Sequence, residues 1–272
     1  LRQEMQGRSR ITFYLEAGDE GFAKLGEVRI ALEELKKARA DCGTLLMTLD
    51  DLEDADWENN WKQYYKPMEI GDRLLVVPEW LREDPKVQAG LRAGRVPLVL
   101  DPGLTFGTGS HATTRLCLTA LEKTIHGGER VLDLGCGSGI LSIAALKLGA
   151  SAATAVDIDD KCLDVAYENA ALNGIGKDRY TVRAGDILTD RKLEAELGGV
   201  KYPLVLANIV ADVIIPLSAW VPQVLSQDGV FLCSGIIAPR AQEVADALAR
   251  NGLKVTKKRE KNGWAALEAV LA

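Results

Sequence analysis

The sequence VLDLGCGSG at residues 131–139 decides the fold of this chain. Its first four residues have the composition of a buried strand, and Gly135, Gly137 and Gly139 follow at alternate positions. Glycine is required where the backbone takes a positive φ or passes close to a ligand. An apolar helix is expected over 140–148. A strand, a glycine turn and a helix in this order predict a doubly wound α/β domain, which binds its ligand at the carboxyl ends of its strands.

Asp157 indicates that the ligand contains a ribose. It ends the next apolar run, 152–156, and lies 22 positions after Gly135. An acidic residue about 20 positions beyond such a turn accepts hydrogen bonds from ribose hydroxyls. A tight structural turn followed by a strand-end acid is the alternative explanation, but it accounts poorly for the glycines, Asp133 and Asp157 together. The sequence therefore predicts a nucleoside site.

The glycine spacing and the charge of Asp133 distinguish between nucleosides. Dinucleotide-binding turns have the spacing G-x-G-x-x-G, whereas position 140 is Ile and the third glycine comes one place early. The Asp133 carboxylate would repel a pyrophosphate and attract a cationic amine. S-adenosylmethionine has a ribose, an amino group and a sulfonium, and no phosphate. It is therefore the predicted cofactor, in preference to NAD.

Composition limits the class of protein and its partners. The 272 residues carry a net charge of −6 and are 47% hydrophobic and 26% charged, as in a soluble globular protein. The acidic balance disfavours direct nucleic-acid binding and favours a basic partner. Five scattered cysteines without a C-x-x-C motif are typical of a reducing cytoplasm. No membrane span or signal peptide is visible, so a cytoplasmic location is expected.

Three regions are expected along the chain. Residues 1–54 form a small unit with strands at 11–15 and 44–49 and a helix at 27–39. This unit buries too little to be stable alone, and because the chain begins at Leu1 rather than Met, residues are expected to precede it. Residues 55–100 form a linker region, with a helix over 54–65 and strands at 73–77 and 97–100 that are joined by a loop containing proline and charged residues. Residues 101–272 form the nucleoside-binding domain.

The nucleoside-binding domain alternates between helices and strands, which predicts a mainly parallel sheet. Residues 190–200 are interpreted as a surface insertion, and Asn262-Gly263 as the turn of a C-terminal hairpin. Helices are expected at 113–123, 140–148, 161–173, 213–225 and 238–251, and strands at 131–134, 152–156, 180–184, 204–207, 230–235, 253–259 and 264–270.

A glycine- and threonine-rich stretch at 101–114 precedes the glycine strand. Its position predicts a lid over the same ligand, although a flexible loop with Thr113 or Thr114 as a helix N-cap is the simpler explanation. His111 is a candidate base, and a hydrogen-bonding role in the lid is equally consistent with the sequence. A metal role is not expected, because His111 and His126 are the only histidines and neither has ligands at suitable spacing.

Two further polar residues follow predicted strands. Asn208 ends the strand at 204–207, where its amide oxygen can accept hydrogens from a substrate amine, or where it simply caps the next turn. Asp186 either borders an adenine or stabilises a turn. Sequence alone does not separate these alternatives.

With these residues assembled, the chain resembles the PrmA family, the bacterial methyltransferases of ribosomal large-subunit protein L11. The resemblance extends over nearly the whole chain. The motifs that carry it are Leu52-Glu53-Asp54-x-Asp56-Trp57 with Trp61, Lys66-Pro67-Met68, Pro78-x-Trp80, Asp101-Pro102-Gly103, Phe106-Gly107-Thr108-Gly109-x-His111-x-Thr113-Thr114, Gly135-Cys136-Gly137-Ser138-Gly139, Asp157-Ile158-Asp159, Ala207-Asn208-Ile209 and Ser234-Gly235-Ile236.

This resemblance implies a Rossmann-like methyltransferase domain preceded by a ferredoxin-like α+β domain, of which only the second half is expected here. It implies that residues 1–54 are a partial substrate-recognition domain. It implies that Thr114, Gly135, Asp157 and Asn208 contact S-adenosylmethionine. With the motifs above, the expected cofactor-binding residues are Phe106, Gly107, Thr108, Gly109, Thr114, Asp133, Gly135, Gly137, Asp157, Ile158, Asp186 and Asn208. Asn208 and His111 are the expected catalytic residues.

The implied reaction is methylation of amino groups on a ribosomal protein, on lysine side chains, the N-terminus or both. Three alternatives stay open. A methyltransferase acting on RNA or a small molecule shares the same core, and an NAD-dependent oxidoreductase shares the strand, turn and helix. A non-catalytic nucleoside-binding module is the third, although it would not need a lid.

Overall fold

A seven-stranded sheet forms the centre of the larger of two units. The computed structural model describes residues 15, 19–38, 45–48, 62, 65–101 and 109–272, and the chain divides into Leu1–Asn60 and Trp61–Ala272. The sheet has the order β6-β5-β4-β7-β8-β10-β9. Its strands are β4 Arg130–Leu134, β5 Ala152–Asp157, β6 Tyr180–Ala184, β7 Tyr202–Asn208, β8 Leu225–Ile237, β9 Leu253–Lys261 and β10 Trp264–Leu271.

The first five strands of this sheet pair in parallel, which confirms the predicted mainly parallel architecture. β10 pairs antiparallel with both β8 and β9. Asn262 and Gly263 turn the β9–β10 hairpin with φ of 50° and 78°, the positive values that an Asn-Gly turn favours. Counted from β4, the strand order is 3-2-1-4-5-7-6, whereas dinucleotide-binding sheets end 5-6.

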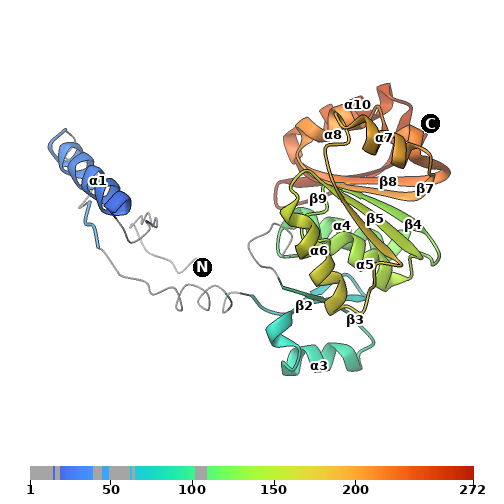
Figure 1. Ribbon diagram of the computed structural model, residues 1–272, viewed down its shortest axis with the longest axis horizontal. Helices are drawn as coiled ribbons and strands as arrows, with labels where there is room; N and C mark the ends of the chain where they lie inside the picture. Colours follow the sequence, from blue (N-terminus) through green and yellow to red (C-terminus); the bar gives the residue numbers. More distant parts are fainter. Residues whose placement is uncertain (1–14, 16–18, 39–44, 49–61, 63–64, 102–108) are drawn as a thin grey trace. The chain divides into compact units, whose positions relative to one another are not determined.

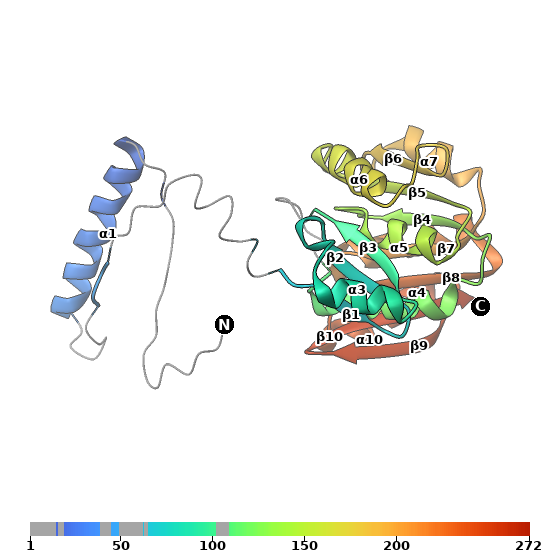
Figure 2. The same cartoon turned by 90° about the horizontal axis from the view of Figure 1, so that it is seen from below.

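Helices cover both faces of the sheet, so that two cores form (Figures 1 and 2). Successive strand residues point to opposite faces; Val131 contributes to one core and Leu132 to the other. One face carries α4 Ala112–Thr124, α5 Ile140–Leu148 and α6 Lys161–Leu172, and the other carries α7 Arg191–Gly198, α8 Ala211–Leu217, α9 Val221–Val224 and α10 Ala241–Arg250.

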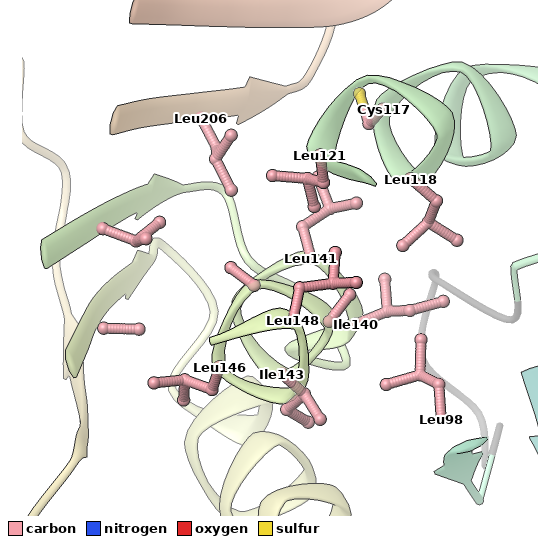
Figure 3. Packing of buried hydrophobic residues seen from close by; sticks show 14 of the residues in the cluster. Leu98, Cys117, Leu118, Leu121, Ile140, Leu141, Ile143, Leu146, Leu148 and Leu206 are labelled. Atoms are coloured by element: carbon pink, nitrogen blue, oxygen red, sulfur yellow. The ribbon is translucent and has the colours of Figure 1, made fainter. Parts of the chain in front are cut away.

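A second, three-stranded sheet explains why α5 is apolar nearly all round. It consists of β1 Met68–Ile70, β2 Leu74–Pro78 and β3 Val96–Leu100, and it shares the core that contains α4 and α5. Figure 3 shows Leu98 of β3 beside Ile140 and Ile143 of α5. Helix α3, Pro85–Arg92, and the 3₁₀ turn η2, Glu79–Leu81, occupy the connection that was predicted as a loop.

Residues 68–100 therefore pack against the large domain. The carboxylate of Glu122 on α4 accepts hydrogen bonds from the N–H groups of Asp72, Arg73 and Leu74 at 2.8–2.9 Å, which holds the β1–β2 turn against that helix. The domain boundaries at residues 54 and 100 stay a prediction.

Two predictions about the large domain are wrong. Residues 190–200 are not a surface insertion: α7 begins at an Asp190 cap, and its Leu193 and Leu197 are buried in the second core. The single helix expected over 213–225 is two helices, α8 and α9. Pro216 lies within α8, and Pro222 lies in the first turn of α9, where a missing N–H is tolerated.

The smaller unit contains α1, Asp19–Ala38, which extends the helix predicted for 27–39 toward its N-terminus. The strand predicted for 44–49 is wrong where the structure describes it, because residues 45–48 form no strand. Leu46 is 82% exposed and Leu45 takes a φ of 42°, which a paired strand does not allow. Residues 11–14, and most of the helix expected over 54–65 with Trp57 and Trp61, lie outside the described residues.

Candidate active site

The glycine turn, Asp157 and Asn208 lie at the carboxyl edge of the large sheet, where the strand order reverses. β4 lies between β5 and β7, and such a reversal is where doubly wound sheets bind ligands. The glycine turn follows β4, Asp157 ends β5 and Asn208 ends β7. Residues far apart in the sequence thus come from three adjacent strand ends.

The glycine turn requires glycine for conformation and for space. Gly135, Gly137 and Gly139 have φ of 77°, 52° and 79°, values that other residues adopt at a cost. A Cβ on Gly135 would collide with the side chain of Ile209, and one on Gly139 would lie 2.7 Å from the hydroxyl of Tyr180. The alternate spacing thus reflects a turn packed closely on its inner side.

Asp157 is the carboxylate that fastens this turn to β5. Its Oδ2 accepts a hydrogen bond from the N–H of Gly137 at 2.8 Å, and its Oδ1 accepts one from Asp159 at 3.1 Å. A carboxylate has about four acceptor positions, so capacity is left for ribose hydroxyls. Ile158 follows directly and its side chain is 79% exposed.

Asp133 lies beneath the turn and is only 1% exposed. Gly139 is the N-cap of α5 and has no side chain to satisfy the helix N–H groups. Asp133 does so instead, because its Oδ2 accepts hydrogen bonds from the N–H and the hydroxyl of Ser142 at 3.2 and 2.7 Å. Burial raises the pKa of Asp133 to about 6, although the bonds from Ser142 act in the opposite direction.

Sequence reasoning missed Ser142, although a serine in the first turn of a mostly apolar helix was a usable signal. It also expected Asp133 as a charge directed at the ligand, whereas one of its oxygens serves α5. The other oxygen, Oδ1, is buried and has no hydrogen-bond partner among the residues that the structure describes.

Asn208 faces the first turn of α4 across the site. Its Nδ2 lies 3.4 Å from the hydroxyl of Thr114, and its Oδ1 is buried without a partner in the described part of the chain. The simpler explanation, that Asn208 caps the next turn, is wrong: α8 has Val210 at its N-cap and no side-chain cap. An amide oxygen is thus held at the end of β7, available to a ligand.

His111, not Thr113 or Thr114, is the N-cap of α4. Its Nδ1 lies 2.8 Å from the hydroxyl of Thr113, and both threonines are buried. The imidazole also makes an edge contact with Trp264 of the C-terminal hairpin, with ring centroids 4.8 Å apart. Sequence reasoning did not connect the hairpin with this helix.

The remaining predicted residues divide into two groups. Asp186 uses both carboxylate oxygens in its own turn, one toward Leu188 N–H and one toward the hydroxyl of Thr189; its contact with an adenine stays a prediction. Gly109 is buried and has a φ of 81°. Phe106, Gly107 and Thr108 lie outside the described residues.

The cysteines of the described segments take no part in this site's chemistry. Cys117, Cys136, Cys162 and Cys233 are buried and free, and burial raises the pKa of the Cys162 thiol to about 11. Thiols of this kind are unreactive at neutral pH. Across the same described segments, no helix is long and apolar enough to cross a membrane.

The cradle of glycines, the Asp157 carboxylate and the unpartnered Oδ1 of Asp133 suit S-adenosylmethionine, whose ammonium and ribose hydroxyls are hydrogen-bond donors. With the antiparallel β10 inserted beside β8, the fold and the site define a Rossmann-like, S-adenosylmethionine-dependent methyltransferase. The profile of the family described as ribosomal protein L11 methyltransferase (PrmA) matches residues 4–271. The chain belongs to this family.

Relatives with known names agree with this assignment. A ribosomal protein L11 methyltransferase from Agathobacter rectalis is 38% identical over 268 residues, covering 97% of this chain and 81% of that protein. The crystal structure of a ribosomal protein L11 methylase from Lactobacillus delbrueckii subsp. bulgaricus is 33% identical, with a TM-score of 0.66 over 76% of this chain and 99% of that one. A Streptococcus mutans protein assigned to the SAM-dependent methyltransferases is 13% identical, with a TM-score of 0.52 over 74% and 69%, a likeness of fold alone.

Proposed function

We propose that this chain transfers methyl groups from S-adenosylmethionine to amino groups of ribosomal protein L11, on lysine side chains, the N-terminus or both. The observation that carries this proposal is Asn208 Oδ1, a buried acceptor without a partner in the described part of the chain, at the strand reversal. Such an oxygen accepts a hydrogen from an attacking amine and orients its lone pair. Family membership supports the choice of substrate.

S-adenosylmethionine supplies an electrophilic methyl group, and the protein supplies position. Holding the amine nitrogen about 3 Å from that carbon, in line with its bond to sulfur, accounts for roughly 7–11 kcal/mol of the barrier. Asp157 and the glycine turn hold the nucleoside, while Asn208 holds the amine on the opposite side. Positive charge moves from sulfur to nitrogen without a net change, so excluding water matters more than adding a counter-charge.

The attacking amine must be neutral, although an ordinary lysine has a pKa of about 10.4. Removing the amine from water lowers the pKa of the amine. Asn208 Oδ1 then accepts a hydrogen bond from one N–H of the neutral amine. His111 has Nδ1 directed at Thr113 within the N-cap of α4. In this proposal His111 therefore holds the first turn of α4 and is not the proton acceptor.

Substrate recognition is assigned to residues 1–54, which we propose present the ribosomal protein to the site. The net charge of −6 supports a basic protein partner, and no direct nucleic-acid contact is proposed. Buried free thiols and a ribosomal substrate support a cytoplasmic location.

The test uses the purified chain, labelled S-adenosylmethionine and purified L11. We expect label in L11 and mass increments of whole methyl groups, and a lower rate of labelling in Asn208→Ala. Ribosomal RNA and L11 with acetylated amino groups serve as matched substrates, and both should stay unlabelled. Label in RNA with none in L11 would refute the proposed substrate.

A further inference from the structure

Two asparagines lie on one face of α6, and neither belongs to the predicted site residues. Asn169 lies in the last turn of α6, and Asn173 is its C-cap residue, four positions later. Residues four apart share a helix face. Asn169 is only 1% exposed, and burying an amide is costly unless its donor and acceptor both find partners.

The partners of Asn169 belong to two different segments that border the site. Its Nδ2 donates to the carbonyl of Ser138 at 3.0 Å, within the glycine turn. Its Oδ1 accepts from the N–H of Asp101 at 2.9 Å, directly after β3. One side chain therefore joins segments that lie 31 and 68 positions away in the sequence.

Asn173 bonds the same strand but does not contact the turn. Its Oδ1 accepts from Val99 N–H at 2.9 Å, and its Nδ2 donates to the Val99 carbonyl at 2.6 Å. β3 is an edge strand, paired only with β2 within its sheet. The Asn173 side chain thus makes the two hydrogen bonds at Val99 that a neighbouring strand would make. Asn169 makes the next bond along the same edge, with Asp101, two residues after Val99.

Three side chains fix the glycine turn and the helix that follows it. Asp157 of β5 accepts a hydrogen bond from the N–H of Gly137, and Asn169 of α6 donates one to the carbonyl of Ser138. Asp133 accepts its hydrogen bonds from Ser142, in the first turn of α5. The sequence pattern had already identified the two carboxylates. Asn169 fixes the carbonyl immediately before Gly139, whose φ is positive, and couples that carbonyl to Asp101, directly after β3.

We propose that Asn169 is a positioning residue of the cofactor site, which sets the conformation of the glycine turn and its distance from Asp101. This inference rests on the proposed function, because it assumes that the turn binds S-adenosylmethionine. Asn173 has the same chemistry and the same strand as a partner, but no bond to the turn. Cofactor affinity should therefore depend on Asn169 and not on Asn173, while fold stability should depend on both.

The experiment compares Asn169→Ala, Asn169→Asp and the matched control Asn173→Ala in the full chain. Unfolding in urea measures stability, calorimetry with S-adenosylmethionine measures Kd, and initial rates separate KM from kcat. Asn169→Asp keeps the acceptor for Asp101 but places an oxygen against the Ser138 carbonyl. If Asn169→Ala does not fold, Asn169→Asp and hydrogen exchange of the turn provide the test.

We expect Asn169→Ala and Asn169→Asp to raise Kd and KM by about tenfold, the effect of losing one buried hydrogen bond, with a smaller change in kcat. Asn173→Ala should lose comparable stability while its Kd stays within about twofold, because the bonds it loses are similar in number but lie away from the turn. Wild-type Kd in a folded Asn169→Asp, or an equal rise in Asn173→Ala, would overturn the inference. A wild-type chain that does not bind S-adenosylmethionine would overturn the proposed function as well.

Discussion

Replacing Asp133 with asparagine should stabilise the chain without cofactor, and the gain should grow with pH. The carboxyl is buried beneath the glycine turn, and one of its oxygens has no partner in the described part of the chain. Burial raises its pKa from an ordinary 3.8 to about 6. The folded chain therefore binds this proton more tightly than the unfolded chain. In the wild type, the contribution of the protonated Asp133 carboxyl to folding stability is complete below pH 4. This contribution is lost as pH rises through about 6.

The size of the effect follows from the interval between these two pKa values. One pKa unit corresponds to about 1.4 kcal/mol, so ionisation of Asp133 at neutral pH costs about 3 kcal/mol of folding free energy as an upper estimate. Asparagine retains an acceptor for Ser142 and carries no charge. Asp133→Asn should therefore match the wild type near pH 4 and exceed its stability at pH 7.

The assay is urea unfolding of both proteins in the same buffers from pH 4 to pH 8. The quantity of interest is the difference between their free energies of unfolding, because contributions from other groups cancel in it. Asp164→Asn, an exposed substitution on α6, controls for the change in net charge. A difference that stays flat with pH, or one in which the wild type gains on the variant as pH rises, would refute this reasoning.

Three further substitutions test the site. Asp157→Ala should weaken S-adenosylmethionine binding by about 1.5–3 kcal/mol, the value of a charge-assisted hydrogen bond; unchanged calorimetry would remove its role. Gly139→Ala should lower unfolding free energy by about 1–3 kcal/mol, because the residue has a positive φ and its Cβ would meet the Tyr180 hydroxyl. Asn208→Ala should lower kcat more than it raises KM for S-adenosylmethionine, as steady-state rates will show; an effect on KM alone would assign Asn208 to cofactor binding.

Local patterns in the sequence were sufficient for the main elements of the sheet. The glycines at 135–139, the alternation of apolar runs and the Asn-Gly hairpin each report a backbone conformation or a one-sided burial that is decided within a few residues. The location of Asp157 and Asn208 at one edge follows as well, because parallel strands that alternate with helices bring their carboxyl ends together.

Contacts between distant segments were decided only in the tertiary structure. The three-stranded sheet over α5 came from residues read as a connection, and α7 from residues read as an insertion, because short elements have weak periodicity and gain their stability from the core they meet. The direction of Asp133 toward Ser142 and the link from Asn169 to Ser138 and Asp101 depend on which segments the topology places side by side. A sequence pattern indicates whether a polar side chain is buried or exposed. The hydrogen-bond partner of that side chain lies on another element, so only the packing of the elements decides which residue the partner is.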